Sequence, residues 1–387
     1  MLAGVRRFLF PLLLIALIVW SARWSTRDEI LRDFGSFWAS GHAANQGKDP
    51  YGVYEETFRV GSPSGPPAPN LNPPVSVYPF RLVALLQPEK ALRLWRYASL
   101  LVYTVVILAL FGRYPERRQP LFVLWAFSIA GLWHTLELGQ VYVPLLALVA
   151  GAWLLLETEV WPVGAVLLGL LVALKPNLAV WPLLLLLTQK RAAGATALAT
   201  ACVFSLSPLV FDGPTIFKEW LAVTPSLHET AGGMARIGGN FSFIAMTGRL
   251  GLPAAGLALS LLLLGLDGYL GLVETLDLTD AGSLGLVSGL LLGPVSWVGY
   301  TILLLPIFFA RRWNLPLKIA AALLCFPFWA AIRVDTAGGT ERLLVESTYS
   351  AAALLVLAGL VLQIAPNRHA DAFRSRFRLL QPAPARP

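Results

Sequence analysis

Residues 161–187 read WPVGAVLLGLLVALKPNLAVWPLLLLL. Two apolar runs, Trp161–Leu174 and Leu178–Leu187, are separated only by the tripeptide Lys175-Pro176-Asn177. Each run is shorter than the ~20 residues that a straight helix needs to cross a bilayer core. A proline-broken pair leaves unpaired backbone at membrane depth, which is tolerated only where it lines a cavity or is covered by protein. The stretch therefore predicts two short helices, running out and back, whose turn faces a cavity.

The composition extends this interpretation to the whole chain of 387 residues. Hydrophobic residues make up 56% and charged residues only 13%, about half the usual charged share of a soluble domain. These proportions exclude a cytosolic enzyme, a disordered chain and a secreted disulfide scaffold, and they predict an all-α polytopic membrane protein. The net charge is +8, and basic residues occur as pairs at the ends of apolar runs, such as Lys190-Arg191 and Arg311-Arg312. This placement is typical of cytoplasmic loop ends in membrane proteins, so we expect no nucleic-acid partner.

A second short pair, Leu284–Leu292 and Tyr300–Ala310, is joined by residues 293–297, GPVSW. The apolar runs together predict a bundle of about twelve transmembrane crossings. These are residues 8–20, 91–111, 121–136, 141–156, 161–174, 178–187, 193–211, 252–272, 284–292, 300–310, 317–332 and 350–364.

The basic pairs place both termini in the cytoplasm under the positive-inside rule. A single transmembrane domain, residues 1–366, then carries two long extracytoplasmic loops, 21–90 and 212–249, and is followed by a basic cytoplasmic tail, 367–387. The first loop mixes aromatic and charged residues, which is typical of short amphipathic helices at a membrane surface. The excess of arginine over lysine hints at a GC-rich genome, and we expect a bacterial plasma membrane.

Asp33 is the first candidate for catalysis, because it follows the first apolar run and is flanked by aromatic residues. A carboxylate held there could act as a general base toward a membrane-embedded substrate. The alternative is an interfacial charge paired with Arg32. Three other acids, Asp28, Glu29 and Asp49, compete for the same role.

Lys175 is the second candidate, at the end of an apolar run and before a proline. A lysine at that depth costs a few kcal/mol unless it is paired, and a lipid phosphate would be a natural partner. The alternative is a lysine that extends its side chain to the interface from a helix end.

The remaining candidates lie in predicted extracytoplasmic turns. Asn240, Ser242 and Arg249 bring amide, hydroxyl and guanidinium groups to one Gly-rich segment, and arginine suits two-point recognition of phosphate. Gln140 and the pair Ser296-Trp297 lie in two further turns. The alternatives are an ordinary Gly-rich turn and an interfacial tryptophan anchor.

Taken in order, these segments resemble glycosyltransferase family 87, a group of polyprenol-phosphate-mannose-dependent mannosyltransferases with the multi-span fold of the C-type glycosyltransferases. The matching elements are Asp33-Phe34, Asp49-Pro50-Tyr51, Asn72-Pro73-Pro74, Gly139-Gln140, Lys175-Pro176, Asn240-Phe241-Ser242 with Arg249, and Pro294-Val295-Ser296-Trp297. The resemblance implies a C-type bundle and makes Asp33 the counterpart of the family's catalytic aspartate. Similar proteins usually carry histidine shortly after the Ser-Trp pair, whereas this chain has Val298-Gly299-Tyr300, which leaves Tyr300 as the candidate for part of that role.

The resemblance implies transfer of a sugar, with mannose expected, from a polyprenyl-phosphate donor to a lipid or glycan acceptor outside the cytoplasm. We expect a single inverting displacement with Asp33 as base, Lys175 and Arg249 beside the phosphate, and membrane lipids around the bundle. Since a lipid phosphate is a stable leaving group and no Asp-x-Asp motif lies in the predicted outer loops, we expect no metal and no other cofactor.

Two other classes of function stay open from the sequence. A transporter or lipid flippase would explain the two proline-interrupted pairs, which are typical of transporter binding sites. Two observations argue against a carrier. No inverted repeat is detectable, and the long first loop is hard to explain in a transporter. A non-catalytic envelope assembly protein is the third possibility, because of the missing histidine.

Overall fold

The computed structural model describes residues 2–26, 31–58, 69–223, 239–273, 276–328 and 347–364. All regular structure within these ranges is helical, and no strand occurs in them. The competing acids Asp28 and Glu29, part of the second predicted loop and the predicted basic tail lie outside the described residues.

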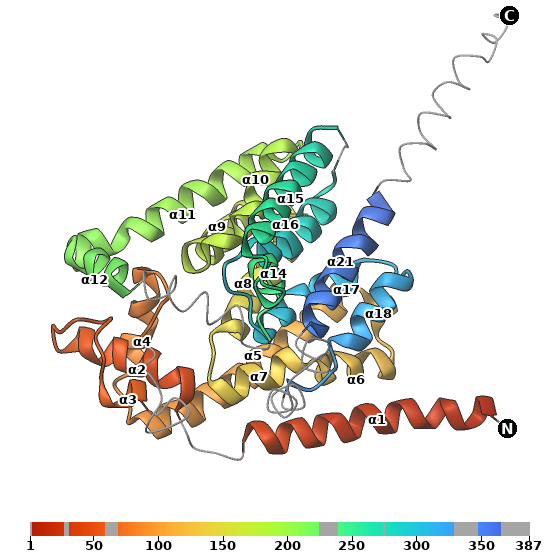
Figure 1. Ribbon diagram of the computed structural model, residues 1–387, viewed down its shortest axis with the longest axis horizontal. Helices are drawn as coiled ribbons and strands as arrows, with labels where there is room; N and C mark the ends of the chain where they lie inside the picture. Colours follow the sequence, from red (N-terminus) through yellow and green to blue (C-terminus); the bar gives the residue numbers. More distant parts are fainter. Residues whose placement is uncertain are drawn as a thin grey trace, which may run out of the picture.

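A bundle of apolar helices forms the body of the protein (Figure 1). Its helices are α1 (Leu2–Ser25), α5 (Pro88–Arg113), α6 (Pro120–Ser128), α7 (Ala130–Leu138), α8 (Tyr142–Leu155), α9 (Trp161–Leu174), η3 (Pro176–Ala179), α10 (Val180–Leu187), α11 (Arg191–Phe211), α14 (Phe243–Arg249), α15 (Pro253–Val273), α16 (Leu278–Leu292), η4 (Val298–Leu304), α17 (Leu305–Ala310), α18 (Leu315–Leu323) and α21 (Thr348–Ile364). Every apolar run predicted from the sequence overlaps one of these helices.

Few of these helices can cross a membrane alone. By length and composition, three qualify among the described residues, namely Pro88–Arg113, Arg191–Phe211 and Ala254–Leu272, with a fourth if α6 and α7 count as one bent span. The other apolar helices are shorter, with α1 counted from Leu9 to Ser25. The protein is thus an all-helical membrane protein, and the number of twelve crossings stays a prediction.

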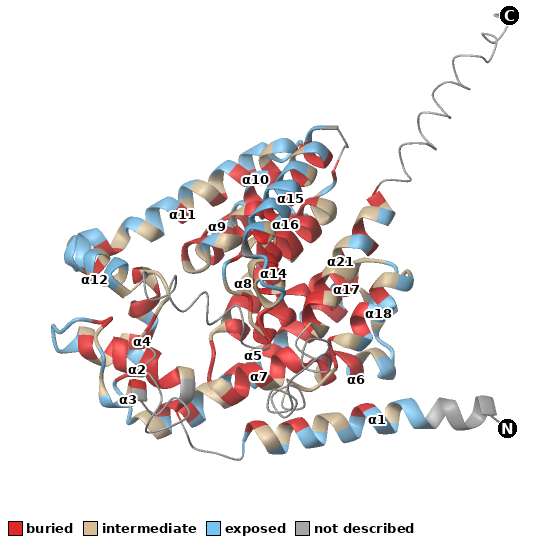
Figure 2. Cartoon of the chain, viewed as in Figure 1, coloured by how far each residue is buried: buried red, intermediate tan, exposed pale blue. Residues whose placement is uncertain are grey.

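The short helices at the centre are covered by protein on all sides. Residues 281–291 of α16 and residues 298–309 of η4 and α17 are all buried. Figure 2 shows this buried centre in red and long exposed faces on α1 and α11. A helix that is apolar on all sides must be covered by protein or by lipid. In this bundle protein covers the short central helices, and we expect lipid to cover the exposed faces of the longer peripheral ones.

One predicted span is broken in the structure. Residues 121–136 were expected to form a single crossing, but the chain turns by 41° between α6 and α7 at Ile129, which has an extended backbone. The N–H of Ala130 there donates to the carbonyl of Leu324 (2.9 Å), so a distant segment satisfies the backbone that the break exposes. The sequence gives no strong local signal for this break, because no proline lies there and the nearest glycine, Gly131, is inside α7.

The two predicted outer loops pack together at one end of the bundle. The first contains α2 (Arg32–Asn45), α3 (Glu55–Phe58), η1 (Pro74–Ser76) and α4 (Val77–Val83), and the second contains α12 (Thr215–Val223). Figure 1 shows these elements gathered at the left. A small apolar cluster of Tyr51, Val77 and Ile216 joins the two loops. The Trp220 indole donates to the carbonyl of Leu71 (3.2 Å).

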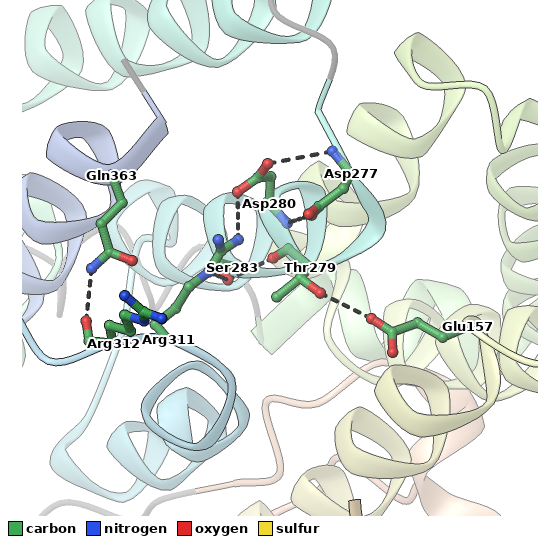
Figure 3. A network of polar contacts seen from close by, with 8 residues as sticks. All are labelled: Glu157, Asp277, Thr279, Asp280, Ser283, Arg311, Arg312 and Gln363. Carbon is green, nitrogen blue, oxygen red and sulfur yellow. Dashed lines mark hydrogen bonds and ion pairs between the residues drawn. The ribbon is translucent and has the colours of Figure 1, made fainter. Parts of the chain in front are cut away.

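A separate polar network ties the opposite ends of the helices, near the basic pairs (Figure 3). Arg311 at the end of α17 pairs with Asp280 of α16 (2.5 Å). Thr279 donates to Glu157 between α8 and α9 (2.9 Å), and Gln363 of α21 donates to the carbonyl of Arg312 (2.9 Å). The two long loops and this network therefore lie at different ends of the bundle.

Candidate active site

Asp33 lies in the first turn of α2, where its side chain is half-buried. The side-chain amide of Gln140 donates a hydrogen bond to Oδ2 of Asp33 (2.5 Å). Two residues 107 positions apart in the chain, both predicted as site residues, are therefore in direct contact. The amide holds the carboxylate without neutralising its charge.

Gly139 makes this contact possible. It ends α7 with a φ of +67°, and a Cβ there would lie 2.6 Å from Cβ of Phe34 and 2.9 Å from Cδ1 of Leu92. Glycine alone tolerates both the left-handed backbone and the close approach of α2. The Trp95 indole donates to the carbonyl of Gln140 (3.2 Å) and fixes the turn from a third direction.

Lys175 caps the C-terminus of α9 and is half-buried. Its Nζ donates to Oδ1 of Asn72 (2.6 Å) and lies 5.4 Å from the centre of the Tyr300 ring. In the part of the chain that the structure describes, no carboxylate lies within ion-pair distance of Nζ. An ammonium group has three N–H donors, so the Asn72 contact leaves capacity for an anionic ligand.

Tyr142 and Tyr300 lie between the aspartate and the lysine. Their ring centres are 4.2 Å apart, and Tyr142 is close enough to Asp33 to be affected by its charge. Gly299 allows this stacking, since a Cβ at that position would lie 2.2 Å from the Tyr142 ring. We call this set the charged array, and its members are Asp33, Gln140, Tyr142, Tyr300, Lys175 and Asn72.

The other predicted residues meet in a second group. Oδ1 of Asn240 accepts hydrogen bonds from the N–H groups of Ser242 (3.3 Å) and Ser296 (2.9 Å). The hydroxyl of Ser242 caps α14, and the hydroxyl of Ser296 donates to the carbonyl of Leu290 (2.5 Å). All three side chains are buried, with Asn240 1% exposed and both serines 0% exposed.

Arg249 completes the second group from the end of α14. Its Nη1 donates to the carbonyl of Asn240 (2.7 Å), and its Nη2 donates to the hydroxyl of Ser350 in α21 (3.0 Å). We call Asn240, Ser242, Ser296, Arg249 and Ser350 the Asn240 knot. Its polar groups bind one another, so its geometry favours a role in holding the fold.

Trp297 and the start of η4 lie between the two groups. Trp297 is half-buried against the main core, and its carbonyl accepts from the N–H of Tyr300 (2.8 Å). Ser296 of the Asn240 knot is thus only four residues from Tyr300 of the charged array. The knot therefore fixes the segment that presents Tyr300 to Lys175.

Comparison with known proteins identifies the family of the chain. The model of glycosyltransferase family 87 matches residues 70–362, which is more than half of the chain. The chain belongs to glycosyltransferase family 87. No curated protein and no solved structure matches it. As a member of this family, the protein is a membrane glycosyltransferase with a sugar donor and an acceptor as substrates.

The family match covers both groups except for Asp33. It includes Asn72, Gln140, Lys175 and Tyr300 but begins at residue 70. The role of Asp33 therefore depends on its contact with Gln140, which lies inside the matched range.

The sequence predicted no role in the site for two members of the charged array, Asn72 and Tyr142. Asn72 stood in a short Asn-Pro-Pro segment, and the chain alone did not show that this segment reaches Lys175, 103 positions away. Tyr142 is two residues beyond Gln140 and reads as the first residue of an apolar helix. Aromatic residues at helix ends are common, so nothing singles it out.

The competing acid Asp49 lies in the interface between the two loops. Its Oδ1 accepts from the N–H of Tyr51 (2.8 Å), and its charge acts on the nearby Glu219 of α12. Burial, followed by the charge of Asp49, raises the pKa of Glu219 above its ordinary value. Beside it, burial and then a hydrogen bond to Asp212 raise the pKa of Tyr78.

The described residues contain no group of three His, Cys, Asp or Glu side chains close enough to hold a metal ion. The charged array itself contributes one carboxylate, one ammonium, two phenols and two amides.

Proposed function

We propose that this family 87 glycosyltransferase moves a sugar, with mannose as the first candidate, from a polyprenyl-phosphate donor to a lipid or glycan acceptor. Asp33 is the general base, and the reaction is a single displacement with inversion. The active site faces the outside of a bacterial plasma membrane, and both termini lie in the cytoplasm. One observation carries the proposal: Asp33 and Lys175 stand at the two ends of one charged array.

The carboxylate of Asp33 accepts the proton of the acceptor hydroxyl as its oxygen attacks the anomeric carbon. The bond from that carbon to the phosphate oxygen breaks, and polyprenyl phosphate leaves with one additional negative charge. A base close to the attacking hydroxyl typically contributes about 10²–10⁴-fold to the rate. Gln140 orients the carboxylate for this step.

The ammonium of Lys175 stabilises the departing phosphate. A preorganised cation at developing negative charge is often the largest single contribution to catalysis. The Tyr300 ring, 5.4 Å from Nζ, attracts the ammonium without cancelling its charge. Tyr300 thereby takes part of the role that histidine has in similar proteins, and the exposed apolar helix faces accommodate the polyprenyl chain.

Arg249 was the second candidate for phosphate binding, together with Asn240, Ser242, Ser296 and Trp297. The contacts within the Asn240 knot support an indirect role for these residues, through the position of η4. A direct contact of Arg249 with the donor stays a separate prediction.

Family membership favours transfer over transport. A carrier or flippase would move its substrate without making or breaking a covalent bond, and an assembly protein would do neither. Reconstituted protein with radiolabelled polyprenyl-phosphate mannose and a lipid extract as acceptor separates the three, because only a transferase places the label in a new product.

The decisive variant is Asp33→Asn, which keeps the shape and the contact with Gln140 but cannot take up the proton. We expect the transfer rate to fall by about 10²–10⁴-fold. Asp49→Asn, in the same loop, is the matched control and should retain the parent rate. Near-normal turnover of Asp33→Asn would remove the proposed base.

A further inference from the structure

Lys175 is held by a neutral amide instead of a carboxylate, and this choice has chemical consequences. We infer that Asn72 is a positioning residue for Lys175: its side-chain oxygen fixes the ammonium in place and leaves the full positive charge for the donor phosphate. The inference rests on the proposed function, because it assumes that Lys175 is where the phosphate binds.

The orientation of the Asn72 amide is determined by a chain of hydrogen bonds. Nδ2 of Asn72 donates to Oδ1 of Asn70 (2.9 Å), and Nδ2 of Asn70 donates to the hydroxyl of Ser40 (3.1 Å). Because both NH₂ groups are used in this direction, Oδ1 of Asn72 is the atom that faces Lys175. Asn70 and Ser40 are buried, at 2% and 1% exposure, so water competes little for these bonds.

The backbone around Asn72 is fixed as well. Its N–H donates to Oδ1 of Asn70 (3.0 Å), and its carbonyl accepts from the hydroxyl of Tyr51 (3.0 Å). A side chain whose backbone and amide are both held can position a flexible lysine, which otherwise loses much rotamer freedom on binding an anion. Preorganisation of this kind increases affinity by lowering the entropic cost of binding.

The chain of amides also places Lys175 relative to the base. It ends at Ser40, which lies in α2, and α2 carries Asp33 in its first turn. Helix α2 therefore positions both ends of the charged array: Asp33 directly, and Lys175 through Ser40 and the two asparagines. A displacement at one carbon atom requires the nucleophile and the leaving group to be aligned, so a common reference serves the chemistry.

The inference can be tested by changing the charge of residue 72, which contacts Lys175. A carboxylate at position 72 would lie at hydrogen-bond distance from the ammonium and form an ion pair with it, against which a phosphate would have to compete. The amide makes no such pair. Asn72→Asp changes one side-chain atom and converts a positioning contact into a competing one.

The experiment measures binding of polyprenyl phosphate and of polyprenol to purified protein in nanodiscs. The ratio of the two dissociation constants isolates the contribution of the phosphate and does not depend on turnover. In the parent protein we expect a clear preference for the phosphate. Asn72→Asp should reduce this preference by about tenfold, and Asn72→Ala by a smaller factor, because the lysine is then unpositioned but still fully charged.

Two controls test whether the effect passes through Lys175. Asn45→Asp adds the same charge in the same loop beside Arg81, whose Nε donates to Oδ1 of Asn45 (3.1 Å), and it should leave the preference unchanged. In a Lys175→Met background, Asn72→Ala should have no further effect on the ratio. Unchanged polyprenol binding in every variant shows that the fold is intact.

The outcomes separate the inference from the function on which it rests. If the parent prefers the phosphate but Asn72→Asp keeps the parent ratio, Asn72 does not position the lysine and the inference is wrong. If the parent shows no preference, or Lys175→Met keeps it, the phosphate binds elsewhere and the proposed donor site itself fails.

Discussion

The charged array and the Asn240 knot contain the same kinds of residues but differ in role. Each contains one basic side chain and amide oxygens, and the two are only a few residues apart at η4. In the knot, both Nη atoms of Arg249 donate to the protein, to Asn240 and Ser350. In the array, Lys175 makes one hydrogen bond and lies beside a ring. A guanidinium that joins two segments about a hundred positions apart holds the fold. An ammonium that makes a single hydrogen bond in a half-buried site has capacity for a ligand.

Burial adds to this difference. Asn240, Ser242 and Ser296 are fully buried, so each of their polar groups must find a protein partner or lose the free energy of hydration. Asp33 and Lys175 are half-buried, so a substrate can reach them. We therefore expect damage to the knot to appear as lost stability, and damage to the array as lost chemistry.

The largest effect should come from exchanging the two cations for methionine, one at a time. Lys175→Met should lower the transfer rate by about 10²–10³-fold, the usual cost of one preorganised group that stabilises charge, with little change in Tm. Arg249→Met removes two charge-assisted hydrogen bonds and should cost about 2–4 kcal/mol of unfolding free energy. Thermal unfolding and transfer assays on the same preparations measure both quantities.

The comparison fails if the two variants behave alike. A stable Arg249→Met protein that has lost transfer would place Arg249 at the donor phosphate, as its sequence context suggested. A Lys175→Met protein with the parent rate would move the phosphate site away from the array.

Much of the bundle could be predicted from the sequence, because hydrophobic runs and proline breaks are local signals. The run Trp161–Leu174 is helix α9 with the same bounds, and the break at Lys175 and that at residues 293–297 both occur where expected. The break at Ile129 was missed, since the partner that satisfies the exposed backbone there, the carbonyl of Leu324, lies far along the chain.

The site was predicted less completely, for the same reason. Asp33, Gln140 and Lys175 were recognisable as polar groups in predicted outer turns, and the structure brings them into one array. The sequence could not distinguish Lys175 from Arg249, because the difference lies in partners such as Asn72 and Ser350 that are about a hundred positions away. Which donors of a cation are already used is a property of the fold.

An effect of intermediate size is expected from alanine substitutions at two glycines, Gly139 and Gly47. Gly139 and Gly47 both have φ of +67°, but only Gly139 has neighbours that a Cβ would meet, with Phe34 closest. Alanine at either position should cost about 1–2 kcal/mol for the left-handed backbone. Gly139→Ala should in addition push α2 away from Gln140 and lower the transfer rate, whereas Gly47→Ala should keep the parent rate. Equal rates in the two variants would show that the contact between Asp33 and Gln140 does not matter for catalysis.

The smallest effect concerns the loop containing α12, which contacts Leu71 next to Asn72 of the charged array. Burial raises the pKa of Glu219 in α12, so the docked loop favours the protonated acid beside Asp49. A carboxyl whose pKa is raised by docking stabilises the docked state at pH below its ordinary pKa of 4.5, and this contribution is lost as the pH rises through the raised value. The packing of α12 on residue Leu71, next to Asn72, should weaken over that range.

Glu219→Gln keeps a hydrogen-bonding group at this position but cannot ionise, so its docking should not change with pH. Hydrogen exchange of residues 215–223, given as the ratio of parent to variant at each pH, cancels the intrinsic pH dependence of exchange. This ratio should rise with pH through the raised pKa, while the same ratio at residues 239–249 in the knot stays constant. Glu116→Gln, an exposed acid near the opposite end of the bundle, provides the control. A flat ratio in the loop would mean that Asp49 and Glu219 do not couple the two loops, and a change in the knot would mean that the two regions are not independent.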